Sequence, residues 1–483
     1  MKTKPIIRRP SPGGARWQSS AWSVAAKTRT RSVGMILLQA CAAIWISLLA
    51  WTASVAALAA APPTPPADDW PQFRGSTGDG IALATNVPVT WSTNQNVKWK
   101  APVPGRGRSS PVLLGDRIWL TTAFETNVRT FSAGPDRMQQ AERVEIGVVC
   151  LDRATGKQLY YKGLFPMDNP PAVNFFNSYA TPTPVAKAGR LYCDFGTFGT
   201  ACLDAASGEV LWKRQLPLEH FQGPGSSPAL YKNLLILVRD GGDQQYIAAL
   251  DTGTGQTVWK SDRPPLSTPV RMFRKSFSTP LVFEAAGQVQ VVVPGAQWFV
   301  SYAPETGKEI WRVDNGKGET VAPRPVYGNG LVYFSTGVYR PKPQLWAVRV
   351  DGQGDVTSTN VAWKLPSSIG FMASPLLVGH ELYLLSDDGF VACVDAASGE
   401  ILNKVRAGGN YAASPTWADG RIYCFSREGK TVVFKADRTL KVLAENQLAG
   451  PLFASPAFVN SAVYVRTDSD LYCLSSAALL SSH

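Results

Sequence analysis

The stretch Ser374–Val405 reads SPLLVGHELYLLSDDGFVACVDAASGEILNKV and decides the fold. It contains four short apolar runs, separated by tight turns at 378–380, 387–389 and 396–399. Short alternating runs bounded by Gly, Asp and Ser are typical of antiparallel strands. The stretch therefore predicts a four-stranded meander. One such meander cannot cover both of its own faces, so it needs further copies of itself.

The chain supplies those copies. Strand starts with Pro in second place recur along it, and after the first pair their spacing is 40–52 residues, which is close to the length of a β-propeller blade. The third strand often ends in an Asp that opens a turn reaching Gly four residues later, and a Trp often follows on the fourth strand. The eight starts are Ser110-Pro111, Thr183-Pro184, Ser227-Pro228, Thr279-Pro280, Arg324-Pro325, Ser374-Pro375, Ser414-Pro415 and Ser455-Pro456. The turns are 152–156, 204–208, 251–255 and 395–399, and the tryptophans are Trp212, Trp259, Trp311 and Trp363.

The segment 96–104, NVKWKAPVP, matches the fourth strands EVLWKRQLP (209–217) and QTVWKSDRP (256–264), yet it precedes the first Ser-Pro start. The last repeat, from Ser455, has only three apolar runs. We therefore predict an all-β fold, an eight-bladed β-propeller of four-stranded antiparallel blades. A strand near Trp99 joins the last blade and closes the ring, which removes exposed sheet edges. Seven blades is the alternative if the repeat near Lys435 is divided differently.

The N-terminal region differs from the rest in composition. Eight basic residues and no acidic residue lie in residues 1–61, so the net charge of +12 falls to +4 for the remainder. Such a body is not the electrostatic footprint of a nucleic-acid binder. Residues 33–61 are almost all apolar, which predicts an export signal, or an uncleaved membrane anchor as the alternative. The expected location is the periplasm or another extracytoplasmic space, with membrane contact only through 33–61.

The expected organisation is a signal or anchor over 1–61, a Pro-rich linker and leading segment over 62–95, the propeller over 96–476 and a tail over 477–483.

The Ser-Pro start, the Asp-x-x-Ser/Thr-Gly turn and the fourth-strand Trp together resemble the pyrroloquinoline-quinone-type (PQQ-like) propeller repeat. That repeat occurs in quinoprotein dehydrogenases and in the propeller lipoprotein of the outer-membrane barrel assembly machinery (BamB). Residues 69–75, DWPQFRG, resemble the start of exported bacterial members. The resemblance extends from Asp69 to the C-terminus. It implies a binding scaffold of the BamB kind or, as the alternative, a PQQ- and calcium-dependent dehydrogenase that oxidises an alcohol or a sugar.

The residues favour the scaffold. Quinoprotein dehydrogenases typically carry two adjacent cysteines, whereas the seven cysteines here are never adjacent. The family's calcium ligands and Asp base match no position, and the chain holds three histidines. We therefore assign no catalytic, cofactor-binding or metal-binding residue and expect no cofactor. Recurrence of the cysteines at equivalent strand positions indicates core packing. A Cys193–Cys202 disulfide stays open as an alternative.

The long connections, 122–148, 166–181, 215–225 and 261–276, all fall on one face of a propeller, and loops carry function more often than the scaffold does. Arg, Tyr and Trp are enriched at interaction surfaces. The predicted function is an exported, non-catalytic and monomeric scaffold that binds an envelope protein or polymer through this face. The candidate partner-binding residues are Arg106, Arg108, Asn177, Tyr179, His220, Arg271, Arg274, Lys275 and Trp298.

Overall fold

The computed structural model describes residues 69–316, 320–337, 343–366 and 369–476. Apart from two short 3-10 turns at Gly196–Phe198 and Arg271–Arg274, the regular elements in these ranges are β-strands. No helix within the described ranges is long and apolar enough to span a membrane. The predictions for residues 1–61 and 477–483 lie outside the described residues.

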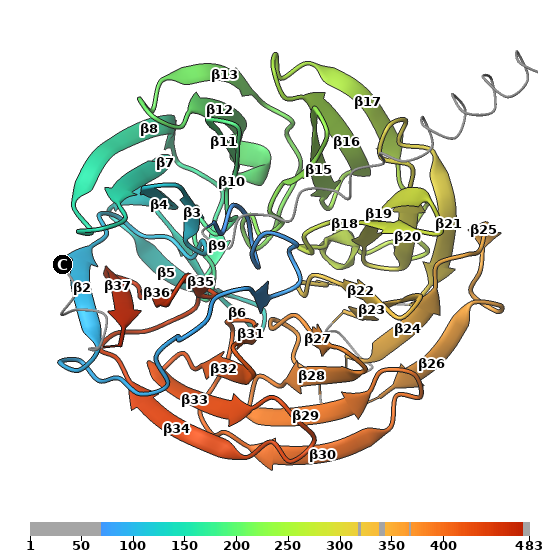
Figure 1. Ribbon diagram of the computed structural model, residues 1–483. Coiled ribbons are helices and arrows are strands. Elements are labelled where there is room, and N and C mark those ends of the chain that lie inside the picture. Colours follow the sequence, from blue (N-terminus) through green and yellow to red (C-terminus); the bar gives the residue numbers. More distant parts are fainter. Residues whose placement is uncertain (1–68, 317–319, 338–342, 367–368, 477–483) are drawn as a thin grey trace, which may run out of the picture. The chain divides into compact units, whose positions relative to one another are not determined.

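The strands form four-stranded antiparallel sheets that follow one another along the chain (Figure 1). In each sheet a first strand of three to five residues is followed by three strands of at least five residues, and the strands follow the sequence order in all sheets except the one that contains β2. The first sheets are β3–β4–β7–β8 (Val112–Leu114, Arg117–Thr126, Arg143–Asp152, Gln158–Asp168), β10–β11–β12–β13 (Val185–Lys187, Arg190–Asp194, Thr200–Asp204, Val210–Arg214), β14–β15–β16–β17 (Ala229–Tyr231, Leu234–Asp240, Gln245–Asp251, Thr257–Asp262) and β18–β19–β20–β21 (Leu281–Ala285, Gln288–Pro294, Trp298–Tyr302, Glu309–Asp314).

The later sheets repeat this arrangement, and two sheets gain a fifth, parallel strand. The fifth strands are β25 (Gly354–Asp355) beside β21, and β1 (Ile81–Ala82) beside β31. The sheets are β22–β23–β24–β26 (Val326–Gly328, Leu331–Ser335, Leu345–Arg349, Val361–Leu365), β27–β28–β29–β30 (Leu376–Val378, Glu381–Leu385, Phe390–Asp395, Ile401–Arg406), β31–β32–β33–β34 (Thr416–Ala418, Arg421–Phe425, Lys430–Lys435, Val442–Gln447) and β35–β36–β37–β2 (Ala457–Val459, Ala462–Arg466, Asp470–Ser475, Val97–Pro102).

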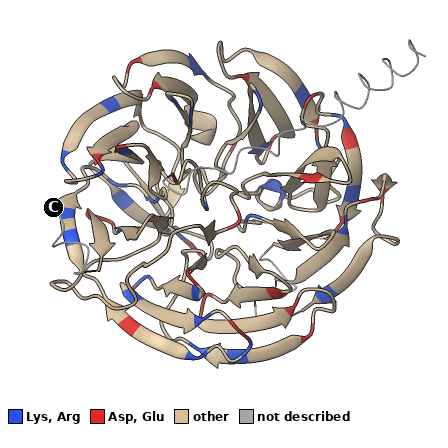
Figure 2. Cartoon of the chain, in the orientation of Figure 1, with Lys and Arg blue, Asp and Glu red and all other residues tan. Residues whose placement is uncertain are grey.

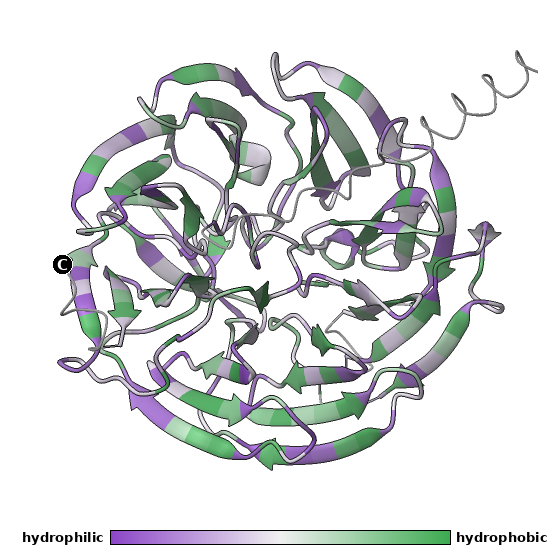
Figure 3. Ribbon diagram, in the orientation of Figure 1, coloured by the Kyte–Doolittle hydropathy of each residue, from purple (hydrophilic) through white to green (hydrophobic). Residues whose placement is uncertain are grey.

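The stretch Ser374–Val405 folds as the predicted meander, β27 to β30. Its second and third strands are almost wholly buried, whereas the fourth strand alternates between exposed and covered residues. Figure 3 shows the same banding of hydrophilic and hydrophobic residues along the outer strands of the other sheets. The inner strands are thus covered on both faces by neighbouring sheets, and the outer strands have one face in water.

The recurring Asp-to-Gly turns have a packing role that explains their sequence. In each, the Asp carboxylate accepts hydrogen bonds from the Ser or Thr hydroxyl and backbone N–H three residues on. These bonds lower the pKa of the Asp carboxyls. The Gly has a positive φ, and an aromatic ring on the fourth strand of the preceding sheet lies where a Cβ would be. The pairs are Trp99–Gly156, Tyr160–Gly208, Trp212–Gly255 and Trp363–Gly399, and Trp259 lies in the same way on Gly307 of the turn that begins at Ala303.

The Ser/Thr-Pro starts form a second link between sheets. At six of these starts the backbone N–H donates to the Ser or Thr hydroxyl at the equivalent position of the next sheet, over 2.9–3.0 Å. Arg324 takes the place of a hydroxyl in this series. Its guanidinium instead donates to the carbonyls of Phe73 (2.9 Å) and Gly78 (3.0 Å).

Residues 69–95, expected as linker and leading segment, pack against the sheets. Trp70 pairs with Leu113, the Pro71 carbonyl accepts from Ala186, and Arg74 donates to the carbonyl of Pro375, so residues 70–80 touch the first strands of three sheets. The segment then pairs through β1 with β31 and buries Trp91 beside Tyr423 and Phe425. Figure 1 shows this blue segment near the centre of the sheets.

The strand expected near Trp99 is β2, and it pairs antiparallel with β37, with Trp99 opposite Cys473. The six described cysteines are buried and free. Cys193 lies opposite Ala201 and Cys202 opposite Tyr192, so the two thiols occupy different positions of the ladder and the Cys193–Cys202 disulfide is not formed.

Candidate functional site

The loop face is defined here as the side on which the first strand of each sheet begins and the second strand ends. Its longest addition is a three-stranded sheet of β5 (Arg129–Ala133), β6 (Asp136–Gln140) and β9 (Val173–Asn174). The predicted insertion at 122–148 is therefore largely strand, because β4 and β7 are ten residues long and β5–β6 forms a hairpin beyond them. Figure 2 shows charges of both signs spread over the sheets.

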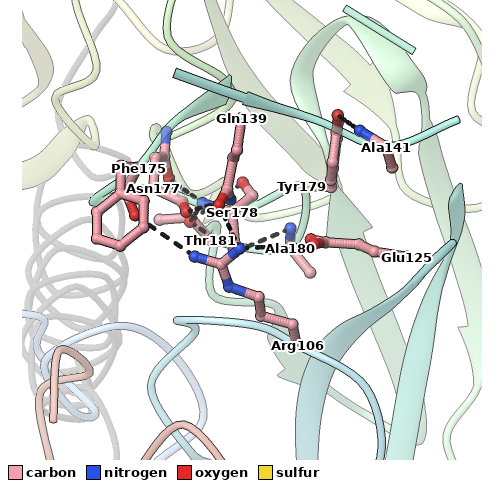
Figure 4. Close-up of polar contacts among 10 residues, drawn as sticks. All are labelled: Arg106, Glu125, Gln139, Ala141, Phe175, Asn177, Ser178, Tyr179, Ala180 and Thr181. Carbon is pink, nitrogen blue, oxygen red and sulfur yellow. Dashed lines mark hydrogen bonds and ion pairs between the residues drawn. The ribbon is translucent and has the colours of Figure 1, made fainter. Parts of the chain in front are cut away.

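Arg106 lies at the base of this added sheet (Figure 4). Its Nη1 donates to Gln139 Oε1 over 2.6 Å, and the same nitrogen is 3.5 Å from Glu125 Oε2. Its Nη2 donates to the carbonyl of Phe175 over 3.4 Å. Burial raises the pKa of Glu125, and Arg106 opposes that shift. Arg106 therefore joins three segments of the loop face rather than extending freely into solvent.

Asn177 and Tyr179 hold the next connection in place. Asn177 Nδ2 donates to the carbonyls of Gln222 (2.8 Å) and Pro224 (3.1 Å). Tyr179 is fully buried, and its hydroxyl accepts a hydrogen bond from the backbone N–H of Ala141 over 3.2 Å (Figure 4). Both side chains support the loops from beneath.

His220 is a neutral packing residue. Its Nδ1 accepts a hydrogen bond from the backbone N–H of Gly223 over 3.0 Å, which assigns the ring proton to Nε2. The ring packs edge-on against Phe198, with centroids 5.3 Å apart. Burial lowers the pKa of His220 to about 4.

The remaining candidates, on the connection before β18 and at the start of β20, are also engaged. Lys275 is buried, and the other three side chains are more exposed. Arg271 forms an ion pair with Glu219, Arg274 Nε donates to the carbonyl of Thr268 (3.1 Å), Lys275 Nζ donates to the carbonyl of Met272 (3.0 Å), and Trp298 Nε1 donates to the carbonyl of Pro265 (3.0 Å).

Arg108 meets two arginines that the sequence analysis did not single out. Its Cζ lies 3.3 Å from the ring centroid of Phe453, and Arg427 Cζ lies 6.0 Å from the same centroid. Arg466 is fully buried, and its Nη1 donates to Ser109 Oγ over 2.7 Å. In the sequence, a single arginine at the end of a strand that joins a buried cluster looks the same as one that extends into solvent. The Arg108–Arg427–Arg466 cluster is thus visible only in the structure.

Two buried ion pairs lie on this side, and one joins two neighbouring sheets while the other lies within the third sheet. Asp194 and Arg239 are joined by a 2.6 Å contact, and Asp240 and Arg263 by a 3.4 Å contact. Burial raises the pKa of Asp240 to about 6, with Arg263 acting in the opposite direction. Each of the two carboxylates already faces an arginine within the protein, so we interpret both ion pairs as structural.

The donor set does not fit a calcium–quinone centre. Within the described ranges no three His, Cys, Asp or Glu side chains converge as metal ligands. The cysteines lie singly at equivalent strand positions, and burial raises the pKa of each described thiol. No chemical step through such a group is derived.

Two cavities of about 420 and 410 Å³ lie away from the arginine cluster. The first lies between the sheets of β21 and β26, beside Trp346 and Lys364. The second lies under residues 72–79, beside Arg324 and Tyr327.

A family model described as outer membrane protein assembly factor BamB matches residues 145–405, more than half of the chain. The chain belongs to the PQQ-like repeat β-propeller family. The matched range contains the four Asp-to-Gly turns and the stretch Ser374–Val405.

One curated relative is tetrathionate hydrolase of Acidithiobacillus ferrooxidans, 25% identical over 330 residues, covering 56% of this chain and 64% of that protein. The chain thus spans less than two thirds of that relative's length. Solved structures of this PQQ-like fold include quinohemoprotein alcohol dehydrogenase from Comamonas testosteroni (12% identity, TM-score 0.57) and the quinohemoprotein alcohol dehydrogenase ADHIIG from Pseudomonas putida HK5 (10%, TM-score 0.54). Each covers 84% of this chain and 80% of its own. At these identities the likeness shows the fold alone.

Proposed function

We propose that this PQQ-like protein is an exported, non-catalytic binding scaffold of the cell envelope that holds a protein or polymer partner on its loop face. The observation that carries the proposal is the added β5–β6–β9 sheet and its surroundings, which expose large apolar side chains. Phe131 is 39% and Val270 45% exposed on two different connections of this face. Large apolar side chains exposed on connections are candidate contacts for a partner.

The proposed scaffold is an eight-bladed ring closed by β2, with the propeller over residues 96–476. Two contacts support closure. β2 completes the last sheet by pairing with β37, and Trp99 of β2 lies on Gly156 of the first sheet, as other fourth-strand aromatics lie on the turn of the next sheet. A closed ring gives the loops a rigid base, as a binding surface requires.

The envelope location rests on the sequence of residues 1–61, where a basic run precedes the apolar stretch 33–61. The family model takes its description from an outer membrane assembly factor, which favours a protein partner. A monomer that meets the membrane only through residues 33–61 fits this role.

Site-specific photo-crosslinking in the native host tests the proposal. A benzophenone amino acid replaces Phe131 or Val270 on the loop face, or the equally exposed Leu211 or Val258 on outer strands, where the exposed fractions are 45% and 52%. We expect a defined crosslinked species from the loop-face positions and none from the outer strands. Equal crosslinking at all four positions, or none at Phe131 and Val270, would refute the assigned face.

A second measurement tests the non-catalytic part. The purified chain is incubated with the quinone, calcium and a dye acceptor, together with an alcohol or a sugar. We expect no dye reduction above that of the heat-treated protein. Turnover that a chelator abolishes would overturn the scaffold in favour of the dehydrogenase.

A further inference from the structure

Two arginines from distant parts of the chain, Arg108 and Arg427, contact one aromatic ring of the loop face, Phe453, and a third, Arg466, lies near Arg108. Arg108 precedes β3, Arg427 lies in the turn between β32 and β33, and Arg466 ends β36. The guanidinium of Arg108 stacks on Phe453 at 3.3 Å, and that of Arg427 lies 4.9 Å from Phe176 and 6.0 Å from Phe453. The rings hold the guanidinium groups by cation–π contact and leave their N–H edges for other partners.

These guanidinium groups carry buried donors that lack acceptors. Among the described residues, no hydrogen-bond partner exists for Arg108 Nε and Nη1, Arg427 Nε, or Arg466 Nε and Nη2. Arg108 is 9% exposed and Arg466 1%. Arg466 Nη1, in contrast, is fixed by Ser109 and by the carbonyl of Thr121 at 3.0 Å. Buried N–H groups without acceptors are costly, so a cluster of them indicates a missing acceptor.

The net charge around these three arginines is positive. Asp468 lies near both Arg108 and Arg466. Glu125, also near Arg108, already pairs with Arg106 at 3.5 Å. Arg108 and Arg466 therefore share Asp468, and the three guanidinium groups together carry more positive charge than this one carboxylate balances.

The backbone of Gly107 packs closely against Arg466, and only a residue without a side chain fits there. A Cβ at this position would lie 2.6 Å from Arg466 Nη2 and 2.5 Å from the carbonyl oxygen of Thr121. The Arg-Gly-Arg sequence at 106–108 thus places two arginines beside a residue without a side chain.

We propose that Arg108, Arg427 and Arg466 form a binding site for a tetrahedral oxoanion, a sulfur or phosphorus centre bearing several anionic oxygens. Several guanidinium edges match several oxygens of one ion, as the planar N–H fork does in phosphate recognition. Arg74 and Arg324 also have buried donors without acceptors, but among the described residues neither guanidinium lies over an aromatic ring, and both lie beside Asp79. The site does not depend on the scaffold role.

Isothermal titration calorimetry on the full chain tests the site. Thiosulfate and phosphate are titrated at constant ionic strength, with chloride as the balancing ion. We expect saturable binding that Arg427→Gln weakens about 10- to 100-fold, because it removes charge-assisted hydrogen bonds. Arg143→Gln is the matched control, since Arg143 is exposed and already paired with Asp168 at 2.7 Å. Arg427→Lys keeps the charge but loses the fork, and we expect an intermediate loss.

Dextran sulfate, titrated in parallel, separates a free ion from an oxoanion carried by a polymer. Binding of the small ions, lost in Arg427→Gln and kept in Arg143→Gln, supports a free oxoanion. Binding of the polymer alone with the same variant pattern supports a polymer-borne group. Absence of saturable binding to either, or equal losses in both Gln variants of matched melting temperature, overturns the proposal.

Discussion

Gly78 offers a sharp test of how the leading segment is held, because Gly330 provides a matched control. Both glycines have φ of 76°. A Cβ on Gly78 would lie 2.0 Å from Arg324 Nη1, whereas a Cβ on Gly330 would have no atom within 4 Å. Gly78→Ala and Gly330→Ala therefore share the same backbone strain, about 1–2 kcal/mol. Only the first displaces a buried guanidinium.

The size of the difference follows from what Arg324 loses. Its Nη1 donates to the carbonyls of Phe73 and Gly78 at 2.9 and 3.0 Å. Hydrogen bonds to a charged group contribute about 1.5–3 kcal/mol each, so losing both costs about 3–6 kcal/mol. For a body of roughly 400 residues the entropy of unfolding is about 0.8 kcal/mol per degree, so Gly78→Ala should melt about 4–7 °C below Gly330→Ala. Differential scanning calorimetry of the two variants measures this. Equal melting temperatures would show that Arg324 does not hold the segment.

Two further predictions concern buried rings. Trp91→Ala should lower the free energy of unfolding by about 3–5 kcal/mol, because it removes a ring stacked on Tyr423 and Phe425. Leu83 lies in the same segment but is half exposed, so Leu83→Ala should change the free energy of unfolding by under about 0.5 kcal/mol. Denaturant unfolding compares them, and equal effects would contradict the packing. His220 has a folded pKa of about 4, below the unfolded value of about 6.5, so only the unfolded state gains a proton as the pH falls between these values. The free energy of unfolding should therefore drop by about 2–3 kcal/mol from pH 7 to pH 4, and His220→Gln should flatten that slope, as denaturant titrations at the two pH values would show.

The sequence predicted the structural features that recur in every repeat, and it missed the contacts that occur only once in the chain. Strand runs, turns and the fourth-strand Trp recur at 40–52 residues, so each copy supports the others, and the four-stranded sheets and the β2–β37 pairing follow from them. Most of the nine candidate residues brace loops, because long connections need internal hydrogen bonds to stay ordered. Arg427 and Arg466 were missed because their meeting with Arg108 joins residues more than 300 positions apart. No local pattern encodes such a contact.

The seams between sheets show how the unique segments complete the repeat. Five seams have a fourth-strand aromatic lying on the glycine of the next turn. In the sixth and seventh sheets, Asn403 and Ala444 occupy the fourth-strand position that the aromatic residue holds elsewhere. In the fourth sheet this position is Trp311, whose ring nitrogen instead donates a hydrogen bond to Gln290.

At each of these three seams a different contact takes the place of the aromatic ring on glycine. Beside the fourth sheet, β25 pairs with β21. Asn403 Nδ2 donates to the carbonyls of Arg438 and Thr439, at 2.9 and 3.0 Å. Beside Ala444, the leading segment inserts Trp91 into the hydrophobic cluster that Ala444 contacts. At Ala444 a small side chain in the repeat is thus matched by a large one from outside it, because a seam left unfilled would be a cavity in a close-packed core. The leading segment therefore belongs to the scaffold.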